Sequence, residues 1–196
     1  RRNTAAAGGG PSLAGEAGTS GDASGGAPGR WESSAFGRAR NDLDGAERAR
    51  ASGNDAFARG RYRTAEECYG SAVEACEFAA KFIEGSGGRG AAETSKLRAL
   101  SLSNRAAARL MLQRPRAALA DCIEALAADP NFEKARLRRG TCHLRCGELA
   151  EAARQFAEVL SNGATGTLRS EARTSLRQAE LSRHDLERVV KALEAA

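Results

Sequence analysis

The sequence lacks the features of a membrane protein and of the common enzyme classes. No stretch approaches the roughly 20 consecutive apolar residues that a membrane-spanning helix needs. HExxH, GxSxG, Gly-rich phosphate loops and paired-acid arrangements are all missing. The "GSGGRG" stretch at 85–90 follows a predicted helix, not the strand of a dinucleotide-binding motif. We therefore expect a soluble, cytoplasmic, non-enzymatic protein with no cofactor and no membrane partner.

Metal-binding spacings are missing as well. The chain has five cysteines but no CxxC pair, and His143 projects to another side of its predicted helix from Cys146. Cys142 and Cys146 are one helical turn apart, about 5–6 Å between Cβ atoms, whereas a disulfide needs about 3.5–4.5 Å. We expect no metal site and five reduced core thiols of an intracellular protein. His143 fits a packed core position better than a general base, and His184 has no companion nucleophile.

A concentrated basic stripe is also absent. The net charge of +5 permits an acidic partner, but lysines and arginines are interleaved with glutamates along most of the chain. A nucleic-acid binder instead concentrates its basic residues on one face. We expect no nucleic-acid partner; the rival case, binding through scattered arginines, would show steep salt dependence.

The first 43 residues hold little that could form a core. They include "AAAGGGPSLAGEAGTSGDASGGAPGR", which is almost entirely Gly, Ala, Ser and Pro. Such a segment cannot offset the entropy lost on ordering, so we expect 1–43 to be disordered. A transit peptide rich in Ser and Arg is the alternative.

From Asp44 onward the pattern is helical, and it repeats. A shift of 34 residues aligns small and apolar positions: Ala106 with Gly140, Leu110 with Leu144, Ala118 with Ala152, Cys122 with Phe156 and Ala125 with Val159. A third copy of the pattern lies 53 residues earlier, at Gly53, Ala65, Tyr69 and Ala72. The extra 19 residues form an insertion between this copy and the next. The small residues mark where two helices of a hairpin approach closely, and the larger ones fill the space between hairpins.

This pattern resembles the tetratricopeptide repeat (TPR). The likeness rests on "SGNDAFARGRYRTAEECYGSAVE" in the first repeat (46–79), "SNRAAARLMLQRPRAALADCIEALAADP" in the second (99–132) and "GTCHLRCGELAEAARQFAEVL" in the third (133–160). It implies an all-α superhelix of three helix-turn-helix repeats over 44–160, with insertion 80–98 elongating the hairpin between the first two. The repeats look most like those of plant-type TPR/J-domain proteins, although the chain has no His-Pro-Asp signature of a J-domain.

Two positions depart from the family pattern. Arg109 stands where an aromatic residue is usual, which leaves the role of that position open. Pro115 replaces a tyrosine before the second helix, where a proline loses no needed hydrogen-bond donor. In the insertion, Phe78, Phe82 and Ile83 continue the helical spacing, so we expect about two extra turns before "GSGGRG". We interpret this as a solvated hairpin extension, with a second contact surface as the alternative.

After the "SNGATGT" break, residues 168–194 are predicted as one further helix in the C-terminal segment 161–196. Its apolar residues keep a spacing of three and four that Arg183 interrupts: Ala172, Leu176, Ala179, Leu186, Val190 and Leu193. Stacked repeats leave an apolar face at each end, so we expect a capping helix. We expect a monomer, with a coiled-coil or dimer contact by the second half of this helix as the alternative.

The resemblance also implies a binding site. In this family the first helices of successive repeats line a concave groove, and one subset binds the acidic C-terminal tails of cytosolic heat-shock chaperones through a two-carboxylate clamp. The clamp motif maps onto five residues: Arg50, Asn54, Asn104, Lys134 and Arg138. A lysine is usual at Arg50, and a planar guanidinium is not equivalent to an ammonium. A peptide ending in Asp offers two carboxylates, which such cations and amide donors bind by charge-assisted hydrogen bonds.

The resemblance therefore implies a co-chaperone or adaptor whose partners are the tails of the seventy- or ninety-kilodalton heat-shock chaperones. The alternative is a TPR scaffold that binds an internal segment of another protein in a multiprotein assembly, for which a free C-terminus is irrelevant. Arg136 and Arg139 lie off the line of Lys134 and Arg138 on the same helix. We expect them to be solvated or paired outside the groove.

Overall fold

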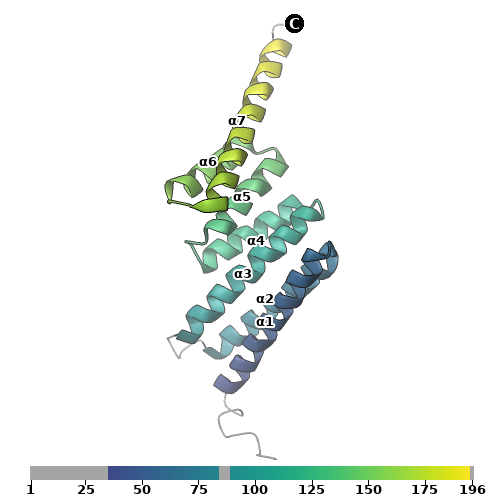
Figure 1. Ribbon diagram of the computed structural model, residues 1–196, viewed down its shortest axis with the longest axis vertical. Helices are drawn as coiled ribbons and strands as arrows, with labels where there is room; N and C mark the ends of the chain where they lie inside the picture. The colour runs from purple at the N-terminus through teal and green to yellow at the C-terminus, as the bar shows by residue number, and fades with distance from the viewer. Residues whose placement is uncertain (1–34, 84–88, 195–196) are drawn as a thin grey trace, which may run out of the picture.

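Helices make up almost all of the part of the chain that the computed structural model describes, residues 35–83 and 89–194, and no strand occurs within these residues. Figure 1 shows them stacked in chain order. They are α1 (Ala35–Ala58), α2 (Tyr62–Ile83), α3 (Arg89–Met111), α4 (Pro115–Ala128), α5 (Glu133–Cys146), α6 (Leu149–Ser161) and α7 (Gly166–Glu194). The prediction of an all-α fold built from helix hairpins is confirmed.

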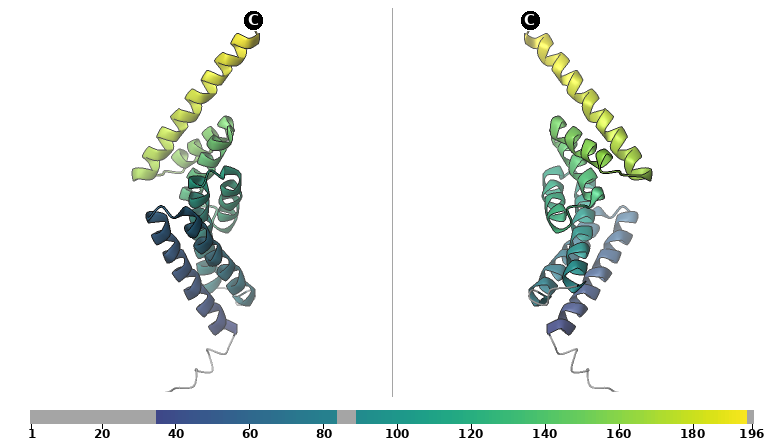
Figure 2. Two further views of the ribbon diagram at one scale, coloured as in Figure 1. Left: turned by 90° about the vertical axis from the view of Figure 1, so that its right-hand side faces the viewer. Right: turned by 90° about the vertical axis from the view of Figure 1, so that its left-hand side faces the viewer.

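The contacts between helices define an inner and an outer layer. Each helix packs against the next one in the chain, and α1 also contacts α3, α3 contacts α5, and α5 contacts α7. Within the described residues, the outer helices α2, α4 and α6 make no such contact with one another. The odd-numbered helices are therefore closer together than the even-numbered ones, so the stack curves with α1, α3 and α5 on its inner side (Figure 2).

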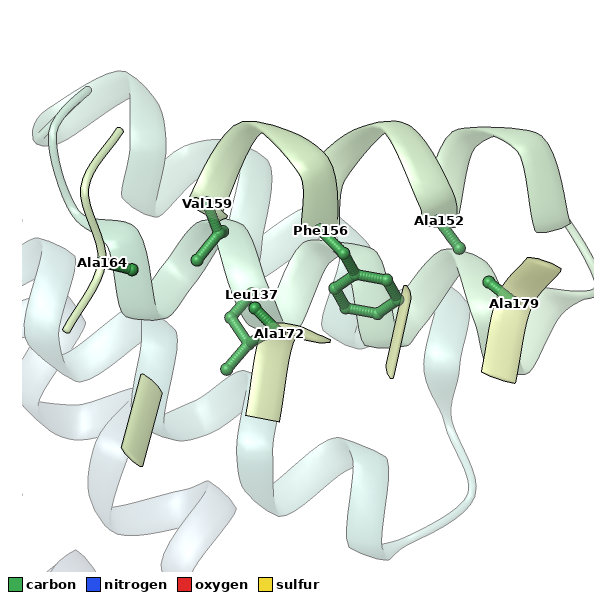
Figure 3. Close-up of a cluster of buried hydrophobic side chains, with 7 residues drawn as sticks. All are labelled: Leu137, Ala152, Phe156, Val159, Ala164, Ala172 and Ala179. Atoms are coloured by element: carbon green, nitrogen blue, oxygen red, sulfur yellow. The ribbon is translucent and has the colours of Figure 1, made fainter. Parts of the chain in front are cut away.

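Paired residue sizes explain how the two helices of a repeat come together. A Cβ atom on Gly140 would lie 2.6 Å from the ring of Phe156, and one on Gly53 would lie 2.6 Å from the ring of Tyr69. Both aromatic rings are buried at these close approaches. Figure 3 shows Phe156 in the cluster formed by α5, α6 and α7. The second repeat instead pairs a larger first residue with a smaller second one, both fully buried: Ala106 and Cys122.

The hairpin between the first two repeats is elongated, as predicted. Helix α2 has 22 residues and α3 has 23, whereas α4 has 14. The eight extra residues of α2 relative to α4 amount to about two helical turns. The prediction that "GSGGRG" ends this helix falls largely on 84–88, outside the described residues. Pro115 is the first residue of α4, the position where its missing N–H costs nothing.

The first helix begins earlier than the sequence predicted. Helix α1 starts at Ala35, so the prediction of disorder over 1–43 is wrong for 35–43; the rest of that segment lies outside the described residues. The stretch "AFGRARNDL" contains Ala, Arg and Leu, which favour helix, and Leu43 packs partly buried against the cluster of Ala46, Ala72 and Cys76. One apolar contact and good helix formers thus extend α1 on its N-terminal side, ahead of the first repeat.

Helix α7 caps the stack with its first half. Ala172 and Ala179 are fully buried against α5 and α6, and Leu168 and Leu176 pack beside them. The predicted helix 168–194 is confirmed, beginning two residues earlier at Gly166. None of the described helices combines the length and the hydropathy needed to cross a bilayer.

Candidate carboxylate-binding site

Two asparagines from different repeats are joined by a hydrogen bond. Asn54 Oδ1 on α1 accepts from Asn104 Nδ2 on α3 at 3.2 Å, and also from the hydroxyl of Tyr69 on α2 at 2.9 Å. The two donors fix the orientation of the Asn54 amide, so its NH₂ group lies on the opposite side and remains available as a donor. One hydrogen bond thus joins two of the five candidate residues across 50 residues of sequence.

Arg138 reaches from α5 to the same part of α3. Its guanidinium donates a hydrogen bond to Ser103 Oγ, the residue before Asn104. Burial lowers the pKa of Arg138 below its usual value, against the opposing influence of Cys122, Tyr69 and Glu171. Within the described residues this guanidinium has no ion-pair partner. Arg138 is therefore a half-buried cation without the carboxylate that a charge withdrawn from water normally has beside it.

Arg50 approaches the same place from α1. Its Nε atom is buried and has no hydrogen-bond partner among the described residues. Burial raises the pKa of Tyr69 above its usual value, and the positive charges of Arg138 and Arg50 oppose that shift. Two cations, one on α1 and one on α5, thus lie near the same phenol ring.

Lys134 is placed by its position on α5. It is exposed and lies one helical turn before Arg138, so both project from one face of the helix. The structure therefore brings Arg50, Asn54, Asn104 and Arg138 together through contacts or electrostatic effects, and adds Lys134 at the solvent side of the same face.

The other two arginines of α5 are paired outside the groove, as predicted. Arg136 donates to the carbonyl oxygen of Pro130 at 2.6 Å and lies 3.6 Å from Glu158 on α6. Arg139 donates to Gln155 Oε1 at 2.8 Å and lies 4.0 Å from Glu158. These two cations hold α5 against α6, whereas Arg138 donates to Ser103 on α3.

A buried ion-pair network holds α3 in place behind the site. Asp121 on α4 is 1% exposed and accepts from Arg105 Nη2 and from Arg109 Nη1, each at 2.7 Å. Arg109 also pairs with Glu66 on α2 at 2.9 Å, and Glu66 with Arg114 at 3.1 Å. Burial alone would lower the pKa of Arg105, but the hydrogen bond to Asp121 and the charge of that carboxylate raise it above its usual value. The role of Arg109, left open by the sequence, is to link three helices.

The remaining candidate residues have structural surroundings. His143 is half-buried on α5, and its Nδ1 atom lies 2.5 Å from Glu148 Oε2, which makes a polar contact at the end of the helix. All five cysteines are free thiols, of which Cys68 and Cys146 are half-buried and the others buried. No group of three or more metal-ligating side chains occurs in the described ranges.

The arrangement of helices matches solved structures of known repeat domains. The second TPR domain of human RPAP3, solved in complex with the HSP70 peptide SGPTIEEVD, is 29% identical, with a TM-score of 0.55 over 72% of this chain and 98% of that one. The Arabidopsis OM64 TPR domain is 27% identical, with a TM-score of 0.55 over 70% and 98%. This chain has the TPR fold. No family model matches it.

Curated relatives of this TPR domain are much longer proteins. Human DnaJ homolog subfamily C member 7 is 30% identical over 115 residues, 59% of this chain and 19% of that protein. The human mitochondrial import receptor subunit TOM70 is 33% identical over 105 residues, 53% of this chain and 15% of that protein. The chain thus matches less than a fifth of the length of either relative.

Proposed function

We propose that this TPR domain is a co-chaperone or adaptor module that binds the free C-terminal tail of a cytosolic heat-shock chaperone of the seventy- or ninety-kilodalton class. The observation that carries the proposal is the unpaired charge of Arg138 beside the linked amides of Asn54 and Asn104. This half-buried guanidinium has one hydrogen bond to Ser103 and no carboxylate partner among the described residues. A peptide carboxylate in the groove would supply the missing partner.

The chemistry of a chaperone tail fits each part of this site. A terminal Asp presents its side-chain and main-chain carboxylates a few ångströms apart, and Lys134, Arg138 and the two asparagines offer charged and neutral donors from α1, α3 and α5. Charge-assisted hydrogen bonds of this kind are roughly twice as strong as neutral ones. The TPR domain of RPAP3 that this chain resembles was solved with a peptide ending in Glu-Glu-Val-Asp, which supports the assignment of the ligand class.

The binding unit that we propose is the set of repeats over 44–160 (46–79, 99–132 and 133–160, with insertion 80–98), capped by 161–196. The proposal requires the domain to face the cytoplasm, where these chaperone tails occur, and no catalytic step is part of it. Arg50 replaces the usual lysine, and the proposal gives its guanidinium the role of that ammonium, with the different geometry of a planar group.

Loss of single clamp residues is expected to weaken tail binding. Lys134→Ala and Asn104→Ala should each reduce the affinity for a peptide ending in Glu-Glu-Val-Asp by about 1–3 kcal/mol, the range for removing one partner of a charge-assisted hydrogen bond. Fluorescence anisotropy of a labelled peptide measures this. Lys81→Ala on the outer helix α2 is the matched control and should bind like wild type, as should Arg136→Ala. Equal losses in all four variants would indicate a diffuse basic patch.

Tyr69→Phe is expected to weaken binding through Asn54 without unfolding the domain. The ring of Tyr69 stays packed against Gly53, but the hydroxyl that orients the Asn54 amide is lost. We expect about a three- to tenfold lower peptide affinity, equivalent to about 0.5–1.5 kcal/mol for one neutral hydrogen bond. The Tyr69→Phe/Asn54→Ala double variant should bind like Asn54→Ala alone; additive losses would show that Tyr69 acts independently of Asn54.

A further inference from the structure

The second half of α7 has an apolar face that nothing in the described chain covers. Its exposed apolar residues include Leu186 (57%), Val190 (45%) and Leu193 (73%), with Val189 beside them. Figures 1 and 2 show this half of the helix extending away from the stacked repeats. The face continues the seam by which the first half of α7 packs against α5 and α6.

The seam has the seven-residue spacing of a coiled coil. Alternating steps of four and three residues run through the buried cap and continue to the end of the helix: Ala172, Leu176, Ala179, Arg183, Leu186, Val190 and Leu193. From Ala179 onward one flank is acidic, at Glu180, Glu187 and Glu194, whereas the same flank carries Arg173 one heptad earlier; Val189 lies on the other flank. Sustained spacing of this kind favours a partner helix packed along the seam.

We propose that the partner is a second copy of the chain, with the two α7 helices packed antiparallel along the seam from Arg183 to Leu193. A parallel pair would place Arg183 against its own copy inside the seam, which is unfavourable. In the antiparallel pair, Leu186 packs against Val190 of the second copy, and Arg183 lies level with Leu193 of that copy. The two arginines are then ten residues apart along the axis, about 15 Å.

One charge pair between the copies supports the antiparallel choice. Antiparallel packing brings Glu194 of one copy level with Arg183 of the other, and it also places the two acidic flanks on the same side. Within its own helix, Arg183 lies 3.8 Å from Glu187. Each Arg183 thus sits between two glutamates, which reduces the repulsion between the acidic flanks. The Val189 residues of the two copies meet on the opposite side and lose their exposure to water.

The expected dimer is weak, because few side chains take part. The contact falls in the smallest class of specific interfaces, below about 1,200 Å² in total, which is typical of transient pairs. The clamp residues lie on α1, α3 and α5, away from this part of α7. Association through α7 should therefore leave peptide binding unchanged, and the two proposals can fail independently.

Sedimentation equilibrium of the full chain over roughly 10 μM to 1 mM tests the proposal. We expect reversible monomer–dimer behaviour in the wild type, and at least a tenfold weaker association for Leu186→Asp and for Val190→Asp. Leu181→Asp is the matched control: Leu181 is 58% exposed on the same helix half but points about 140–180° away from these two residues at 100° per residue. A wild type that stays monomeric throughout, or equal weakening by Leu181→Asp, would overturn the proposal.

Cross-linking tests the orientation. A mixture of Arg183→Cys and Leu193→Cys chains is expected to form a mixed disulfide between positions 183 and 193 under mild oxidation, identified by mass spectrometry of the linked peptides. Preferential 193–193 linkage in the Leu193→Cys chain alone would indicate parallel packing and would contradict the antiparallel assignment. Circular dichroism of each variant confirms that the helical content is retained, so a folding defect cannot be mistaken for lost association.

Discussion

Asp121→Ala is expected to lower the free energy of unfolding by about 3–5 kcal/mol. The substitution leaves the half-buried guanidinium of Arg105 without its carboxylate and removes one of the two acids that hold Arg109. Breaking a buried pair by removing one partner has a cost of this size because an uncompensated charge remains. Urea denaturation followed by circular dichroism would measure it, as a lower midpoint with an unchanged slope.

The matched control for this loss is Asp185→Ala on α7. Asp185 also pairs with an arginine, Arg188 at 3.7 Å, but both side chains are more than 70% exposed. Exposed pairs of this kind contribute about 0–1 kcal/mol, so the control should unfold almost like wild type. If Asp121→Ala loses less than about 1 kcal/mol, the network does not hold α3 in the way described above.

Arg138→Met is expected to abolish most tail binding while leaving the fold as stable as before or slightly more stable. In the complex, Arg138 would be one partner of a buried charge pair, and truncating such a partner costs about 2–5 kcal/mol of affinity, roughly 30-fold or more. In the free domain the same guanidinium has no ion-pair partner among the described residues. Its replacement by an apolar side chain of similar length therefore removes a half-buried, unpaired charge and loses only the bond to Ser103.

Anisotropy and thermal unfolding on the same samples separate these two effects. Arg116→Met, at an exposed position on the outer helix α4, is the control and should match wild type in both measurements. A loss of stability in Arg138→Met as large as its loss of binding would mean that Arg138 is a structural residue. Unchanged binding would remove it from the site.

The repeat spacing in the sequence was sufficient to predict the order of the helices and their pairing. Small residues such as Gly53 and Gly140 recur at fixed distances from the aromatic residues that they contact, because each repeat solves the same packing problem. The choice of Asn54 and Asn104 came from the family's clamp motif and not from the repeat spacing, because the two asparagines occupy different positions of their repeats.

Features that depend on side-chain partners could not be predicted in this way. Arg109 departs from the family pattern, and its pairing with Glu66 and Asp121 depends on which acids the outer helices direct toward it. The hydroxyl of Tyr69 is the one atom that distinguishes it from the phenylalanine of the third repeat, and only the contact with Asn54 gives that atom a role. The early start of α1 depends on the packing of Leu43, which lies outside the repeat.

The central claim is that the groove binds a free C-terminus, and a pair of peptides tests it most directly. One labelled peptide ends in Glu-Glu-Val-Asp with a free carboxylate, and its twin differs only in a C-terminal amide. We predict that the amide binds at least tenfold more weakly in anisotropy at moderate salt, because it removes a hydrogen-bonded charge worth about 1.5–3 kcal/mol. Equal binding of the two peptides would contradict the clamp and favour a scaffold that grips internal segments.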